Sequence, residues 1–278
     1  MKQILTTTVG ALAFAALMTP ALAADMPVKA PVYKAPIVDP WNWSGVYIGL
    51  NAGYSWGRSN TDVTFRNNTT GALLFATNRS FDLDGWIGGG QIGVNWQFGY
   101  WVGGIEADIQ WSGQKGSTFI SCAVTVCNPL ADTFATNVVT ASLNQRLAWF
   151  GTLRARLGAT LTPTALLYVT GGLAYGRVDS DGLFTGFTIA GIPTSNTFSS
   201  STTKAGWTVG AGLEARLGGN WTGKIEYLYI DLGSVQTNTI NLLMGPPVLL
   251  SFNSRITDNI ARVGINYKFD AGPVVARY

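Results

Sequence analysis

The chain has 278 residues, of which 12% are charged and none is histidine, and its formal net charge at pH 7 is +3. Because histidine is absent, Ser-His-Asp and Cys-His nucleophile systems, two-histidine metal sites and proximal-histidine haem ligation are excluded. The charged content is about half the usual ~25%, and the 34 glycines are nearly double the usual share, so the chain is short of the polar surface that a soluble domain needs.

The N-terminus has the three parts of a secretory signal peptide. Lys2 supplies the positive charge, Ile4 to Met18 form the apolar stretch, and Ala21-Leu22-Ala23 is a small-x-small cleavage site. An uncleaved anchor helix is the alternative, but Pro20 ends the apolar run where a peptidase would cut. We predict a signal peptide over residues 1–23 and an exported chain, whose remaining charge of +2 is too small to indicate nucleic acid as a partner.

Residues 24–42 form the predicted periplasmic leader. This segment contains four prolines and the lysines Lys29 and Lys34, a composition typical of an extended linker. The lysines suit either a contact with peptidoglycan or a plain tether, and the sequence leaves both interpretations open.

From Trp43 onward the dominant period is two, which is typical of β-strands. In residues 46–56 an apolar side chain alternates with a small or polar one, so one face of the strand is apolar. Seven later segments repeat this alternation: 86–98, 101–111, 146–159, 166–178, 207–217, 224–229 and 261–269.

Tryptophan spacing distinguishes a membrane barrel from a soluble sandwich. Trp86 and Trp96, and likewise Trp101 and Trp111, are ten residues apart on an apolar face. Ten residues at ~3.3 Å, tilted by about 40°, rise about 25 Å, the height of the apolar band between the aromatic girdles of an outer-membrane barrel. The predicted girdle residues are Trp56, Trp86, Trp96, Trp101, Trp111, Trp149, Trp207, Trp221 and Phe269.

The connections alternate between short and long, as periplasmic turns and extracellular loops do. We therefore predict an all-β fold: an eight-stranded antiparallel transmembrane β-barrel over residues 43–278, with four long extracellular loops. Its predicted location is the cell outer membrane, with outer-membrane lipid and lipopolysaccharide as partners. The short connections are 98–100, 160–165 and 218–220, and the long ones are 58–82, 112–144, 179–204 and 233–253.

The polar face of the strands is predicted to point into the barrel. An eight-stranded interior is only wide enough for its own side chains, so we expect these charges to form an ion network without an aqueous pore. A narrow channel that attracts anions through an excess of bases is the alternative. The predicted interior charges are Glu106, Asp108, Arg146, Arg154, Arg156, Glu214, Arg216, Lys224, Glu226, Arg262 and Lys268.

The predicted outer loops contain three features of note. Cys122 and Cys127 lie in an exported chain and are predicted to form a disulfide, because the pair alone could not complete a metal site. Asp179 and Asp181 are the acidic pair that rim chemistry would use, but Asp-Ser-Asp-Gly is more typical of a turn. Residues 240–250 suit a hairpin that either extends the wall or binds a partner. No catalytic activity, metal or cofactor is predicted.

Several motifs resemble those of the small outer-membrane barrels of alphaproteobacteria, the surface antigens sometimes called the RopB-like family. They include Trp43-Ser44-Gly45-Val46-Tyr47-Ile48-Gly49, Gly104-Ile105-Glu106-Ala107-Asp108 and Val263-Gly264-Ile265-Asn266-Tyr267-Lys268-Phe269. The resemblance covers essentially the whole mature chain and implies a structural, surface-facing barrel. A porin-like channel and loop-mediated adhesion or ligand binding are the alternatives. Haem binding, linked to some related barrels, would here need a Tyr, Met or Cys ligand.

Overall fold

The computed structural model describes residues 41–67, 69–123, 138–187, 193–241 and 248–269. Among these residues no helix is long and apolar enough to cross a membrane. The described residues form eight strands: β1 (Gly45–Asn67), β2 (Leu73–Phe98), β3 (Trp101–Ala123), β4 (Val138–Thr162), β5 (Ala165–Phe187), β6 (Pro193–Gly218), β7 (Trp221–Asn241) and β8 (Val248–Lys268).

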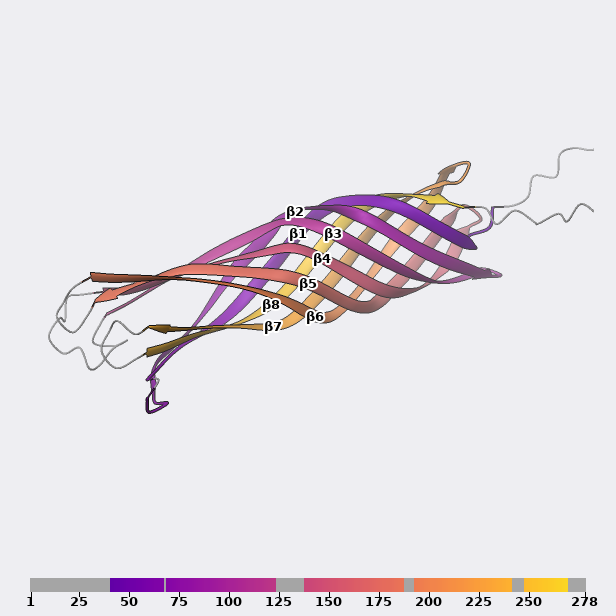
Figure 1. The fold of residues 1–278 in the computed structure, drawn as a ribbon. Helices are drawn as coiled ribbons and strands as arrows, with labels where there is room; N and C mark the ends of the chain where they lie inside the picture. The colour runs from indigo at the N-terminus through magenta and orange to yellow at the C-terminus, as the bar shows by residue number, and fades with distance from the viewer. Residues whose placement is uncertain (1–40, 68, 124–137, 188–192, 242–247, 270–278) are drawn as a thin grey trace, which may run out of the picture. The chain divides into compact units, whose positions relative to one another are not determined.

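Each strand pairs antiparallel with the next, and β1 pairs with β8, so the sheet closes into a barrel (Figure 1). Two residues connect β2 to β3, β4 to β5 and β6 to β7. The β2–β3 turn contains Gly99 at φ 63°, a left-handed conformation that glycine adopts without steric cost. The predicted eight-stranded antiparallel barrel is confirmed.

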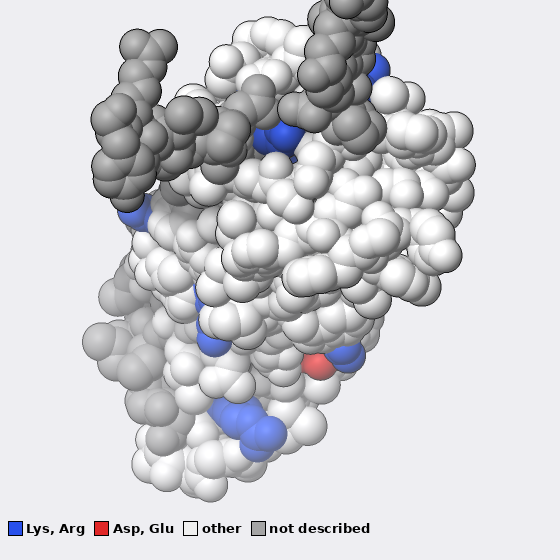
Figure 2. All heavy atoms as spheres, turned by 90° about the vertical axis from the view of Figure 1, so that its right-hand side faces the viewer, with Lys and Arg blue, Asp and Glu red and all other residues white. Residues whose placement is uncertain are grey.

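The outer face of the barrel is apolar and ringed by aromatic side chains. Trp86 is 75% exposed and Trp111 is 68% exposed. The rings of Tyr54 and Trp86 meet edge to face 5.2 Å apart near one end of the apolar band, and those of Trp221 and Tyr267 meet 5.1 Å apart near the other. An apolar surface of this kind is stable when hydrocarbon covers it. Figure 2, which is viewed from the right-hand side of Figure 1, shows few charged groups on that side of the molecule, and most of them are basic.

All nine predicted girdle residues lie on this outer surface, where Trp149 is half-buried and the others are exposed. We take the part of each strand between the two girdles as its membrane-spanning segment.

The aromatic ring that includes Trp86, Trp111 and Trp149 lies toward the long connections, and we call it the outer girdle. Beyond the outer girdle the barrel divides into two sheets. The β2–β3 ladder ends at Asp84 and Lys115, and the β6–β7 ladder ends at Trp207 and Asp231, whereas the other ladders continue toward the strand tips. The strand orders are β2-β1-β8-β7 and β3-β4-β5-β6, and Figure 1 shows the two groups diverging. The connections predicted as long loops are therefore mostly strand.

Apolar side chains pack between the two diverging sheets. The Phe65 and Phe184 rings, from β1 and β5, lie 6.2 Å apart, and the Phe198 and Phe252 rings, from β6 and β8, stack at 5.4 Å. Both contacts join one sheet to the other, so the extension beyond the girdle is a β-sandwich with its own core.

A bulge in β4 inverts the side-chain alternation. The register shifts between Leu147 and Trp149, and Leu147 is only 2% exposed although the period-two pattern predicts it on the lipid face. The extra residue moves every position before it to the opposite face. Arg146 is consequently exposed, and the prediction that it points inward is wrong.

Candidate functional site

The centre of the barrel interior is an ion network organised around Arg154. This guanidinium, on β4, is fully buried and donates hydrogen bonds to Glu106, to Asp108 at 2.9 Å and to Glu226 at 3.0 Å. The carboxylates come from β3 and β7, so one planar fork links three strands across the lumen. Their side chains face inward because they occupy the polar positions of the period-two pattern.

Three further cations complete the network. Lys224 donates to both oxygens of Glu106 at 2.9 Å, and Arg262 donates to Glu226 at 2.7 Å. Arg156 donates to Glu214 at 2.7 Å. The eight buried groups are four acids and four bases, so their charges cancel. A buried charge is tolerated when it is paired and hydrogen-bonded in this way.

Neutral donors occupy further lone pairs of these carboxylates. The Tyr47 hydroxyl donates to Glu106 at 2.7 Å, and the Tyr168 hydroxyl donates to Glu226 at 3.0 Å. The Arg156 guanidinium lies 4.0 Å from the centre of the Tyr168 ring, a cation–π contact. These bonds fix the side chains in one arrangement.

The other three predicted interior charges lie elsewhere. Arg146 pairs with Asp179 at 2.9 Å on the outer surface. Arg216 is exposed, so its predicted interior position is wrong, and its guanidinium lies 4.7 Å from the centre of the Trp41 ring. Lys268 is 9% exposed and donates to the backbone oxygen of Asn42 at 2.7 Å. The last two occupy the mouth because they stand at the ends of β6 and β8.

Trp43 closes the end of the barrel that carries the short turns. It is 2% exposed and packs among Val102, Leu166 and Tyr168, while its backbone N–H donates to Gln97 at 2.8 Å. No role was predicted for Trp43, although Trp41 and Trp43 stand close together just ahead of the first strand and could have indicated one.

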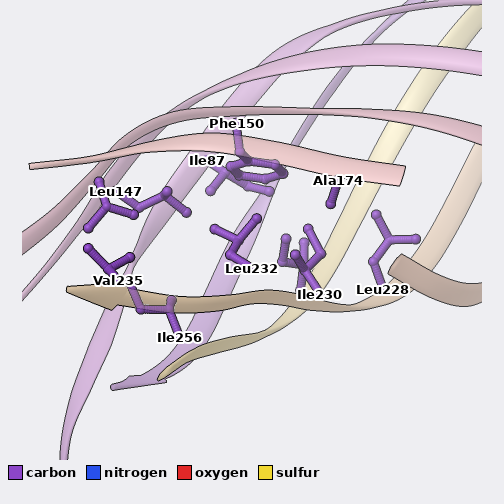
Figure 3. Close-up of a cluster of buried hydrophobic side chains, with 11 residues drawn as sticks. Ile87, Leu147, Phe150, Ala174, Leu228, Ile230, Leu232, Val235 and Ile256 are labelled. Atoms are coloured by element: carbon purple, nitrogen blue, oxygen red, sulfur yellow. The ribbon is translucent and has the colours of Figure 1, made fainter. Parts of the chain in front are cut away.

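An apolar cluster fills the interior on the other side of the ion network. Figure 3 shows Phe150 and Ile87 facing Leu232 and Ile230 across the lumen. Phe150 has no exposed surface, and the other three are at most 4% exposed. At the level of the cluster, Asp258 is buried between Ile256 and Ile260 of β8 and accepts hydrogen bonds from Ser55 and, at 2.6 Å, from Gln114.

Asp179 and Asp181, the acidic pair of the outer surface, form hydrogen bonds with neighbouring side chains. Asp179 accepts hydrogen bonds from Ser201 at 2.6 Å and from Arg177 and Arg146 at 2.9 Å. These bonds lower the pKa of the Asp179 carboxyl to about 2, so it is ionised at neutral pH. Asp181 accepts from Asn144 at 3.1 Å, and the two carboxylates therefore bind different partners.

The predicted disulfide lies partly outside the described residues. Cys122 is near the end of β3, whereas Cys127 belongs to the segment that is not described. The bridge remains a prediction, as do the signal peptide and the leader up to residue 40.

Comparison with known proteins agrees with this geometry. A family model described as the outer membrane protein beta-barrel domain matches residues 9–269. The chain is 38% identical over 277 residues to the 31 kDa outer-membrane immunogenic protein of Brucella melitensis biotype 1, which covers 97% of this chain and 100% of that protein. It is 30% identical over 243 residues to the 25 kDa outer-membrane immunogenic protein of Brucella abortus biovar 1, covering 87% and 85% of the two chains.

A third relative is the 22 kDa outer membrane protein of Rhizobium leguminosarum bv. viciae, 29% identical over 239 residues, which are 85% of this chain and 82% of that one. The resemblance to small alphaproteobacterial surface barrels is thereby confirmed. The chain belongs to the outer membrane protein β-barrel domain family, and its location is the cell outer membrane.

Proposed function

We propose that the protein is a closed structural barrel that anchors a surface-exposed β-sandwich in the outer membrane and neither conducts solutes nor catalyses a reaction. The observation that carries this proposal is the filled interior. Trp43, the eight-charge network and the apolar cluster around Phe150 follow one another along the lumen. Small barrels of eight strands have room inside only for their own side chains.

The charge balance disfavours the narrow anion channel. That alternative depends on an excess of inward bases, and Arg146 and Arg216 do not belong to the interior. The apolar cluster would also oppose ion passage, because an ion that passes closely packed apolar side chains loses hydration that they cannot replace.

The proposal predicts no conductance. The refolded mature chain, inserted into planar bilayers, is expected to give no current steps above baseline, and liposomes containing it are expected not to swell in small sugars. Insertion is verified by the different gel mobilities of the folded and heated protein. Steady current steps with anion selectivity would contradict the proposal and support the channel.

We infer that lipopolysaccharide phosphates bind a cationic cluster just beyond the outer girdle. Arg177 is the register partner of Trp149, which places its guanidinium at headgroup level. Arg146 and Arg177 share the single carboxylate of Asp179, and Lys115 is the register partner of Arg146. Asp84 is in turn the register partner of Lys115, so the three cations face two carboxylates and the cluster keeps an excess of one positive charge. Guanidinium groups bind phosphate bidentately.

Removal of this charge is expected to reduce stabilisation by lipopolysaccharide. The double variant Arg146→Gln/Arg177→Gln should lose about 1 kcal/mol per cation of the extra stability that lipopolysaccharide vesicles give over phosphatidylcholine vesicles. Thermal unfolding in both kinds of vesicle measures this difference in stability. The control Arg66→Gln removes an exposed cation ten residues beyond Trp56 and should keep the full difference. An unchanged difference in the double variant would refute the site.

The surface role is supported by the relatives. The Brucella proteins are named outer-membrane immunogenic proteins, and the β-sandwich is the part of this chain that would meet an external surface. A contact of the leader with peptidoglycan is the alternative to a plain tether.

A further inference from the structure

The gap between β6 and β7 exposes two strand edges beyond the membrane. Their ladder ends at Trp207 and Asp231, yet β6 continues to Pro193 paired with β5, and β7 continues to Asn241 paired with β8. Among the described residues no ladder pair joins the two strands beyond that point. Each strand therefore has a row of backbone N–H and C=O groups directed at the gap.

The direction of the backbone groups follows from the neighbouring ladder. The Thr208 hydroxyl of β6 donates to the Tyr229 backbone oxygen, so the outward residue Tyr229 directs its carbonyl at β6. Val209 of β6 is the register partner of Tyr229 and directs its backbone N–H and C=O at β7. Along β6, every second residue from Val209 directs its backbone groups to the same side. No register shift interrupts β6 against β5. The residues with edge-directed backbone groups and exposed side chains are Ser195, Thr197, Ser199, Ser201 and Thr203.

Between Pro193 and Lys204, the β6 edge lacks the usual protection against strand addition. Natural edges carry charges, prolines or bulges. Ten consecutive residues of β6, from Thr194 to Thr203, include neither a charge nor a proline, and β7 is uncharged from Ser234 to Asn241. The gap between β2 and β3 is protected by charge, because β2 carries Arg79 and Asp82 along its edge.

The place where β6 and β7 separate is hollowed. A pocket of about 320 Å³ is lined there by Ala205, Trp207, Asp231, Gly233 and Arg255, among others. Gly233 has φ 71° and follows a register shift in β7, which turns that strand away from β6. The pocket gives the end of an added strand room for a side chain.

We propose that the β6 edge from Ser195 to Thr203 binds an extended segment of an extracellular partner protein by strand addition. Neither edge offers a charge to the partner, so the segment is held through its backbone and needs no charged side chain. Its side chains alternate, with apolar ones on the inner side beside half-buried Phe198 and hydroxyl-bearing ones outward. This activity goes beyond the proposed structural role and does not depend on whether the barrel conducts.

The test uses a fluorescein-labelled nonapeptide of alternating Thr and Val and the refolded full barrel in detergent. Fluorescence anisotropy should show saturable binding. Ser199→Pro removes an edge-directed donor and adds a ring at the edge, so it should weaken binding by about tenfold or more. Ser199→Ala keeps the backbone donor and should bind like the wild type. Proline is tolerated at an exposed edge, and gel mobility before and after heating verifies folding.

Three results would overturn the proposal: no saturable binding to the wild type, equal affinity of the wild type and Ser199→Pro, or loss of binding in Ser199→Ala. Analytical sedimentation of the barrel without peptide tests whether a second copy of the chain occupies the edge. A dimer that Ser199→Pro dissociates would show that a second copy of the chain, and not a partner protein, occupies this edge.

Discussion

Replacement of Arg154 by alanine is expected to destabilise the folded barrel by about 3–5 kcal/mol, because it leaves buried carboxylates without their shared partner. Glu106, Asp108 and Glu226 all accept hydrogen bonds from this guanidinium, and Lys224 and Arg262 would be left to neutralise them. Urea unfolding in lipid vesicles, followed by tryptophan fluorescence, measures the free energy of unfolding.

The matched control for Arg154 is Arg58→Ala. Arg58 forms a 3.4 Å ion pair with Asp82, but both side chains are largely exposed to solvent. Such pairs contribute little to stability, so this variant should unfold like the wild type. Equal losses in the two variants would mean that the interior network does not stabilise the barrel.

Leu147→Ala is expected to cost about 3–5 kcal/mol, whereas Leu153→Ala on the same strand should cost about 2 kcal/mol. Leu147 is buried in the apolar cluster, so its truncation loses transfer free energy and leaves a cavity. Leu153 is 49% exposed on the lipid face, where hydrocarbon closes around the shorter side chain.

The same vesicle unfolding measurement distinguishes these two leucines. Without the β4 bulge, the period-two pattern puts both side chains on the lipid face and predicts equal costs. Equal values would therefore contradict the inverted position of Leu147.

The membrane-spanning part of the fold was predictable because lipid outside and packed charge inside impose period two on every strand. Trp86 and Trp96 marked the girdles, and Glu106 and Arg154 marked the inward positions. Neither prediction needed the pairing register.

The features that could not be predicted from the sequence depend on a local irregularity or on long-range pairing. The bulge beside Leu147 adds one residue without a distinctive composition, so Arg146 was assigned to the wrong face. The division into two sheets depends on which ladders continue beyond the girdle, and the hydroxyl-rich stretch around Ser199 has the composition of a loop. Trp43 was placed at a domain boundary, and only the structure shows it inside the mouth.

The β1–β8 ladder has a consequence for assembly. It joins the first strand to the last, so the ring cannot close until the C-terminal strand has been delivered to the membrane. Any shortened polypeptide that lacks β8 would keep the edges of β1 and β7 unpaired in hydrocarbon, where unpaired backbone groups are costly. Insertion must therefore follow export of β8. The hairpins that form early wait for the pairing of β1 with β8, which has the largest sequence separation and is therefore the slowest contact to form.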